Sequence, residues 1–314
     1  MAQPGPVART VADLDLMMSV LATQLTERTT EVVAPVPWPD FKRISVPSLR
    51  VGMYVDDGFF PASPAIRRAV REAAAILKDQ GAEVEEFVPP VVDEAVHLFL
   101  AIASSDGGAW IRHMLGRDRP DRRVKGLLDA AGIPDVIRPL VANAVERSGQ
   151  RLLAFAMRSI RRKSAREYWQ TIEELNAYRA RFIAAMDAAR LDVLICPPHA
   201  LPALTHGSGD NLTVFSAASY SVLYNVLGMP AGVVAATRVR EGEESDRPSS
   251  KDPVDQAALR VEHGSAGLPV GVQVVARHWR EDVVLAVMGV LEKQFRAESD
   301  YPRSPMSVIP PCRS

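Results

Sequence analysis

The sequence predicts an α/β protein, because short apolar strands alternate with amphipathic helices along most of its length. Residues 49–54 form an apolar run of strand length. Ser63 and Pro64 supply a helix cap and a proline at the first helical position, and Gly81 ends the helical pattern. Residues 83–88 alternate again, as expected of a strand near a sheet edge. These segments form one β-α-β unit, which implies a right-handed crossover.

The segment before this unit predicts an amphipathic helix over residues 13–25. Its apolar residues, Met17 and Leu21 among them, recur at helical spacing. Asp13 and Asp15 lie in the first turn, where carboxylates favour the positive end of the helix dipole.

The segment after the unit is mainly helical from about residue 92 to residue 189. Glycines and prolines interrupt it, and its last part, residues 164–189, reads as one long helix with Phe182 and Met186 on its apolar stripe. Residues 191–196 then form an apolar run that predicts a buried strand.

The last third of the chain continues the alternation with a helix over residues 215–227 and a strand over residues 231–236. Residues 240–257 are charged and rich in Ser and Pro, which predicts a disordered surface insertion. A further strand, a helix and a Pro-rich tail are predicted over residues 269–275, 281–295 and 301–314.

Composition excludes several classes of protein. A formal net charge of -1 over 314 residues gives no basic field for nucleic acid. Cys196 and Cys312 are too few for a disulfide framework, and the six histidines lack metal-ligand spacing. No signal peptide or run of ~20 apolar residues is visible, so a cytoplasmic protein is expected. The excess of Arg over Lys is typical of a bacterial gene rich in G and C.

Three motifs carry a family resemblance over nearly the whole chain. They are the GPVARTVADL run at residues 5–14, SYSVLYN at 219–225 followed by PAGVV at 230–234, and GLPVGVQ at 267–273. Their order and their residues resemble those of the amidase signature family, in its fatty-acid amide hydrolase branch. The resemblance implies a mixed β-sheet core flanked by helices. It also implies that residues 1–314 are the C-terminal part of a single domain whose N-terminal half is missing here.

The resemblance also places the family's chemistry upstream of this sequence. The family's Ser-cis-Ser-Lys triad lies in a Gly/Ser-rich core before the first motif, so we expect no catalytic residue in this chain. No metal or cofactor is expected either. The six lysines are expected to be solvated, and Ser208 lacks the preceding strand of a nucleophile turn. Cys196 is expected to be a small buried apolar group.

Five residues are candidates for substrate binding, by resemblance to the branch's acyl channel. Phe215, Ala218 and Val222 fall near one face at helical spacing, while Trp279 and Tyr54 match an aromatic near the C-terminus and a tyrosine near the pocket. Core packing is an equally weighted alternative, because apolar stripes are usually core.

Three functions stay open at this point. The chain is the C-terminal part of an acyl amide hydrolase, a non-catalytic pseudoenzyme that binds acyl ligands or a partner protein, or a Ser-Lys hydrolase with an unrecognised nucleophile. The expected partner is a small-molecule acyl amide. Polar residues interrupt the apolar faces of residues 133–157, so weak or no membrane association is expected. Oligomers are possible, because half of a shared sheet would leave an unpaired edge.

Overall fold

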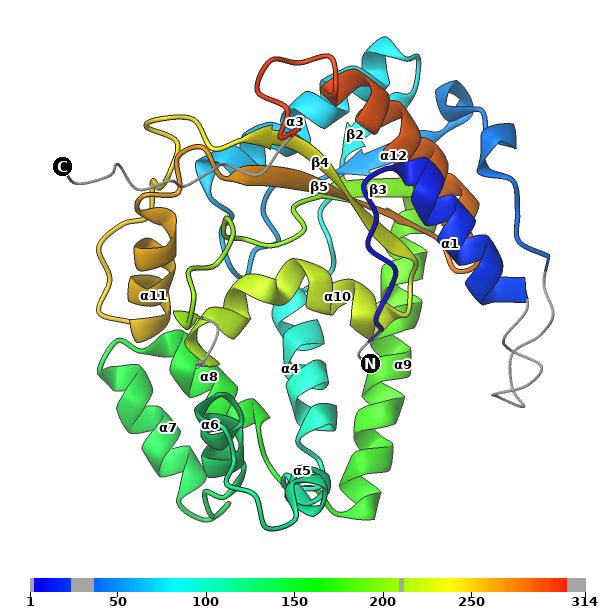
Figure 1. Cartoon of the computed structure of the whole chain (residues 1–314). Helices are drawn as coiled ribbons and strands as arrows, with labels where there is room; N and C mark the ends of the chain where they lie inside the picture. Colours follow the sequence, from blue (N-terminus) through cyan, green and yellow to red (C-terminus); the bar gives the residue numbers. More distant parts are fainter. Residues whose placement is uncertain (1–2, 24–36, 209–211, 304–314) are drawn as a thin grey trace.

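A five-stranded mixed sheet forms the centre of the computed structural model, which describes residues 3–23, 37–208 and 212–303 (Figure 1). The strand order is β2-β1-β3-β5-β4. β1 pairs in parallel with both β2 and β3, whereas β5 is antiparallel to β3 and β4. The strands are β1 (Arg50–Met53), β2 (Glu83–Glu86), β3 (Val193–Cys196), β4 (Ala231–Arg238) and β5 (Pro269–Ala276). The predicted α/β fold is confirmed, and β2 lies at an edge as its alternation indicated.

Two helices cover one face of this sheet (Figure 1). α3 (Pro64–Asp79) and α12 (Glu281–Phe295) contact each other as well as β4 and β5. α12 starts and ends where the sequence predicted. α1 (Val11–Thr23) packs on α12, and the amide of Val11 donates to Glu292 at 3.2 Å. Two 3-10 turns, Phe41–Arg43 and Val46–Ser48, lead into β1. Residues 24–25 of the predicted first helix lie outside the described residues.

The opposite face of the sheet carries α10 (Ser219–Leu227), which packs on α4 (Val92–Ala103) and α9 (Ala165–Ala188). α10 is preceded by a 3-10 helix, Leu212–Ala218, so the helix predicted over 215–227 is two segments. A capping box starts α9: Ser164 accepts from the amide of Glu167, whose side chain accepts from the amide of Ser164. The backbone bond from Ser164 is the main reason that the pKa of Glu167 falls to about 2.

A lobe of four helices lies away from the sheet, to the left of α4 and below it in Figure 1: α5 (Ala109–Leu115), α6 (Arg122–Ala131), α7 (Arg138–Arg147) and α8 (Arg151–Ser159). One buried side chain connects its segments. The guanidinium of Arg138 donates to the carbonyls of Ala130, Met157 and Ile160. Among the described residues, no helix is long and apolar enough to cross a membrane.

The segment expected to be a disordered insertion, residues 240–257, has a defined structure instead. Its end is the first turn of α11 (Pro253–Glu262), and Asp252 caps this helix through Val254 while accepting from the amide of Leu152 on α8. Arg247 pairs with Glu262, with side chains 5% and 1% exposed. The composition misled the prediction, because the charged residues of this segment bind partners far away in the sequence. The predicted tail is described only as far as residue 303.

Arg247 and Glu262 form a buried ion pair, and both side chains make further hydrogen bonds. Ser63 donates to Glu262 at 3.0 Å, and Ser245 donates to its other oxygen. Arg247 also donates to the carbonyl of Pro61 at 2.9 Å and lies over the ring of Phe60. The pair therefore fastens the 240–252 segment to the start of α3.

Removing the Arg247 side chain should destabilise the chain, because it leaves the Glu262 carboxylate buried without its cation. We expect Arg247→Ala to lower the free energy of unfolding by about 3 kcal/mol in urea titrations. The matched control is Arg43→Ala, whose side chain is 86% exposed beside Asp40 and should change stability by less than about 0.5 kcal/mol. Equal effects of the two substitutions would contradict a fastening role for Arg247.

Candidate functional site

The strand order indicates that a site lies at the carboxyl ends of β1 and β3. From β1 the chain crosses to β2 on one side, and it later returns as β3 on the other side of β1. The carboxyl ends of β1 and β3 therefore meet at a point where the strand order reverses. Ligands of open α/β sheets bind outside such ends. Tyr54 follows β1 here, Cys196 ends β3, and α10 crosses over both.

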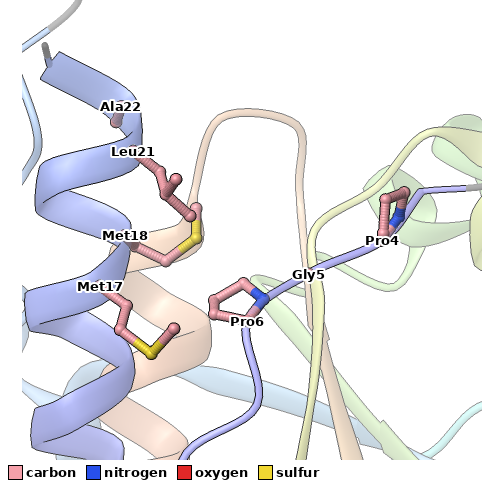
Figure 2. A pocket seen from close by; sticks show the side chains of 7 residues that line it. All are labelled: Pro4, Gly5, Pro6, Met17, Met18, Leu21 and Ala22. Carbon is pink, nitrogen blue, oxygen red and sulfur yellow. The ribbon is translucent and has the colours of Figure 1, made fainter. Parts of the chain in front are cut away.

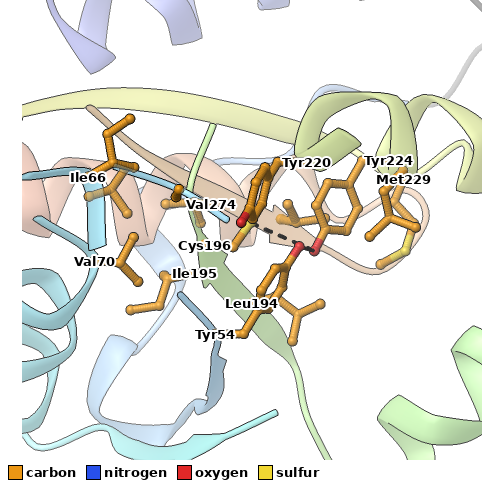
Figure 3. Close-up of a cluster of buried hydrophobic side chains, with 14 of the residues drawn as sticks. Tyr54, Ile66, Val70, Leu194, Ile195, Cys196, Tyr220, Tyr224, Met229 and Val274 are labelled. Atoms are coloured by element: carbon orange, nitrogen blue, oxygen red, sulfur yellow. Dashed lines mark hydrogen bonds between the residues drawn. The ribbon is translucent and has the colours of Figure 1, made fainter. Parts of the chain in front are cut away.

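A buried network joins these elements (Figure 3). The hydroxyls of Tyr54 and Tyr224 lie 2.7 Å apart, and the thiol of Cys196 lies 3.8 Å from the hydroxyl of Tyr224. The amide of Gln273 on β5 donates to Cys196 Sγ at 3.3 Å and to the carbonyl of Tyr220 at 3.3 Å. The network thus ties β1, β3, β5 and α10 together.

The same burial keeps these groups neutral. Burial is the main cause that raises the pKa of Tyr54 and of Tyr224 well above the usual range. It also raises the pKa of the Cys196 thiol to about 11. Since the thiolate is the reactive form of cysteine, Cys196 is not an activated nucleophile. The prediction that it is a small buried group is confirmed.

A second set of polar groups fixes the loop after β1 to the first turn of α10. The Asp57 carboxylate accepts from the hydroxyl of Ser219 and from the amides of Phe59 and Phe60, the two amides at 2.9 Å. Tyr220 donates to the carbonyl of Phe60 at 3.0 Å. The positive end of the helix dipole also stabilises a carboxylate at the start of a helix. Burial is the main cause that raises the pKa of Asp57, and its hydrogen bonds oppose the rise.

Four of the five predicted binding residues lie on α10, in the 3-10 helix before it, or in contact with α10. Tyr54 stacks on Tyr220 of α10, with ring centroids 6.2 Å apart. Val222 is buried on the same helix, and Phe215 and Ala218 are half-buried in the 3-10 segment before it. All five candidates stay predictions as binding residues, because buried positions on α10 also serve the core.

Trp279 lies in the turn between β5 and α12 and is 76% exposed. Its backbone is left-handed, with φ of 63°, which is uncommon for a bulky residue. Its neighbour His278 bonds the carbonyl of Leu227 at the end of α10 through Nε2, at 3.0 Å. The turn therefore holds the indole in solvent at a cost in backbone strain, which is typical of functional positions.

Sequence reasoning missed several residues of this region. Phe99 of α4 packs on Phe215 with centroids 5.6 Å apart. Gln273 belongs to the buried network and Asp57 fixes the loop after β1 to α10, yet neither was singled out. Gln273 ends one of the three family motifs, and a polar residue inside the apolar strand β5 was a signal that it is bound internally.

A serine and a histidine lie within bonding distance elsewhere, without forming a nucleophile and base. His97 Nδ1 lies 2.9 Å from the Ser159 hydroxyl. That hydroxyl donates its one proton to the carbonyl of Phe155, so His97 is the donor in this pair. Burial is the main cause that lowers the pKa of His97.

The prediction that all lysines are solvated is wrong for Lys163, because partial burial lowers its pKa. Lys163 meets a serine only through its backbone, since its amide donates to the carbonyl of Ser105 at 2.8 Å, and no side-chain bond seen within the described residues joins a lysine ammonium to a serine hydroxyl. The described part of the chain likewise has no cluster of three His, Cys, Asp or Glu side chains that could hold a metal.

Comparison with known proteins decides the family. The amidase family model matches residues 1–285. The chain belongs to the amidase family. It is 32% identical over 261 residues to fatty acid amide hydrolase 1 of Caenorhabditis elegans, a match that covers 82% of this chain and 45% of that protein. It is 32% identical over 294 residues to fatty-acid amide hydrolase 1 of Sus scrofa, covering 92% and 50%.

Solved structures agree on the fold. A fatty acid amide hydrolase structure aligns with a TM-score of 0.69 at 21% identity, covering 92% of this chain and 47% of that one. The chain therefore spans about half the length of the amidase-family relatives that it matches.

The raised pKa of Asp57 predicts a pH dependence of stability. The folded chain keeps the Asp57 proton to a higher pH than the unfolded chain, whose carboxyl has the ordinary pKa of 3.8. The contribution of Asp57 to stability therefore falls as the pH rises from 3.8 through the folded-state pKa. Asp57→Asn cannot ionise, so its stability relative to the unmodified chain should improve in urea titrations as the pH rises from 3.8 through the folded-state pKa. Asp56→Asn, at the exposed neighbour, is the control; an equal drift there would contradict the assignment.

Proposed function

We propose that this chain is the C-terminal part of an amidase that hydrolyses the C–N bond of a carboxylic amide, with fatty-acid amides as the substrate class. The observation that carries the proposal is the match over most of the chain to proteins named fatty-acid amide hydrolase. Apolar and aromatic side chains on and before α10 lie beside the carboxyl ends of β1 and β3. Ligands of such folds bind at such ends, and apolar substrates need an apolar lining.

The part of the reaction that this chain serves is binding and positioning rather than bond cleavage. Amide hydrolysis needs an activated nucleophile, a base that accepts its proton, and donors for the oxyanion. Cys196 is buried with a raised pKa, and the Ser159 hydroxyl donates to a backbone carbonyl. We infer that the Ser-cis-Ser-Lys triad is supplied from outside this sequence.

The pseudoenzyme alternative rests on the same network. We call Phe215, Ala218 and Val222, on and before α10, the α10 wall. The hydrogen bonds of Tyr54, Tyr224 and Gln273 hold this wall in place, so the wall is formed whether or not a nucleophile is added. A protein that binds acyl ligands without turning them over needs only this wall.

A cytoplasmic location, a bacterial source and weak or no membrane association stay predictions.

The chain alone should not hydrolyse amides, because we infer that the triad is supplied from outside this sequence. We expect no turnover above background with an oleamide-type amide or with a short aryl amide, measured by release of the amine. The positive control is a fusion that supplies the Gly/Ser-rich half of a fatty-acid amide hydrolase, for which we expect turnover. Activity of the chain alone that survives repurification and disappears on a single Ser→Ala change would overturn this expectation.

Enlarging the α10 wall in the fusion should discriminate between substrates by acyl length. We expect Val222→Trp to lower kcat/KM for long acyl amides by about tenfold or more while sparing short ones, because the added ring fills space that the acyl chain needs. Asn225→Trp adds the same ring at a half-exposed position of α10 and is the control. Equal loss on both substrate lengths would indicate misfolding, and no loss would place the channel elsewhere.

A further inference from the structure

The α10 wall forms one apolar stripe that runs from the 3-10 helix into α10. In the 3-10 helix, Phe215 and Ala218 are half-buried, whereas Ser216 and Ala217 between them are buried. Residues three apart eclipse each other in a 3-10 helix, so Phe215 and Ala218 share one side of it. Val222 follows one turn later on α10, at the spacing that keeps it on this side.

α4, which packs on α10, supplies a second apolar stripe. Phe99 is half-buried, and Ile102 and Ala103 follow it at the spacing that places them on the same side of α4. Ile102 is half-buried and Ala103 is exposed, so this side of α4 becomes more open toward the end of the helix. The rings of Phe99 and Phe215 join the two stripes, with centroids 5.6 Å apart and planes inclined by 30°. Because both side chains are half-buried, part of the surface of each ring stays accessible.

Aromatic rings attract one another in a way that saturated groups do not. Ring pairs favour offset-stacked or edge-to-face arrangements with centroids about 4.5–7 Å apart, and they gain energy beyond that of the apolar area they bury. The separation between Phe99 and Phe215 lies in this range. A ligand ring placed against this pair is therefore held more tightly than a saturated ring of the same size.

Resting on the proposed amide hydrolysis, we propose that Phe99 and Phe215 form an aryl-binding subsite for the acyl end of the substrate. The subsite makes the chain prefer carboxylic amides whose acyl chain ends in an aryl ring over amides with a saturated end of equal size. The apolar stripes on either side of the ring pair receive the methylene segment of such a substrate. Phe99 and Phe215 are thus specificity-determining residues.

A second apolar surface has to be separated from this subsite. An open depression of about 600 Å³ lies between α1 and the segment that precedes it (Figure 2). Its lining contains no aromatic ring and consists of Pro4, Gly5, Pro6, Met17, Met18, Leu21 and Ala22. Methionine sulfurs also favour aromatic rings, so Met17→Leu is the variant that reports binding in this depression.

The test compares two ligands of the full chain, 6-phenylhexanamide and 6-cyclohexylhexanamide, which share one carbon skeleton and differ in the aromaticity of the end ring. Isothermal titration gives the Kd of each. Phe99→Leu and Phe215→Leu each remove one ring and keep an apolar side chain. Phe41→Leu is the matched control, because Phe41 is also half-buried but packs beside Gly289 of α12, on the other face of the sheet.

We expect the phenyl ligand to bind about fivefold more tightly than the cyclohexyl ligand, although apolar area alone favours the saturated ring. This preference should disappear in Phe99→Leu and in Phe215→Leu, and it should stay unchanged in Phe41→Leu and Met17→Leu. Partial unfolding of a variant lowers its affinity for both ligands alike, so the ratio of the two Kd values separates ring contact from destabilisation.

Equal binding of the two ligands by the unmodified chain, or tighter binding of the cyclohexyl ligand, overturns the proposal. Binding of neither ligand overturns it as well. A preference that only Met17→Leu removes also contradicts the proposal, because the depression at α1 is then the binding site.

Hydrolysis of the same two amides by the fusion separates this proposal from the proposed function. An aryl preference in binding without hydrolysis of either amide supports the subsite and contradicts the function. Hydrolysis of both amides without any aryl preference supports the function and contradicts the subsite.

Discussion

The hydrogen bond between Tyr54 and Tyr224 is the interaction on which the site region depends. It joins the carboxyl end of β1 to the middle of α10 in the buried core, where its loss would leave a hydroxyl without a partner. An unsatisfied buried polar group costs about 1–3 kcal/mol, whereas a satisfied network specifies one arrangement of its elements. Cys196 and Gln273 extend the same network to β3 and β5. The position of α10, and with it Val222, follows from these bonds.

Asp57 and the start of α10 complete this arrangement from the other end of the helix. The carboxylate accepts from Ser219 and two loop amides, so the loop after β1 and the helix hold each other in place. The cost is a charge in a buried position, which the raised pKa of Asp57 records. Groups of this kind persist where they position something else, and here they position the residues that precede and begin α10.

In the proposed function, this chain contributes binding and positioning rather than bond cleavage. Its core holds an aromatic and aliphatic wall at the reversal point of the sheet, while its polar side chains there are engaged in holding that wall.

The sequence by itself determined the family, the α/β class and most elements, because these depend on local periodicity, caps and motifs within short windows. The capping residues of α9 and the limits of α12 are examples, since each is set by residues a few positions apart. Only the tertiary structure decided which polar residues serve the core and which segment is ordered. Ser63 meets Glu262, Asp57 meets Ser219 and Phe99 meets Phe215 across long sequence separations. No local pattern encodes such pairings, because they depend on where the sheet brings distant segments together.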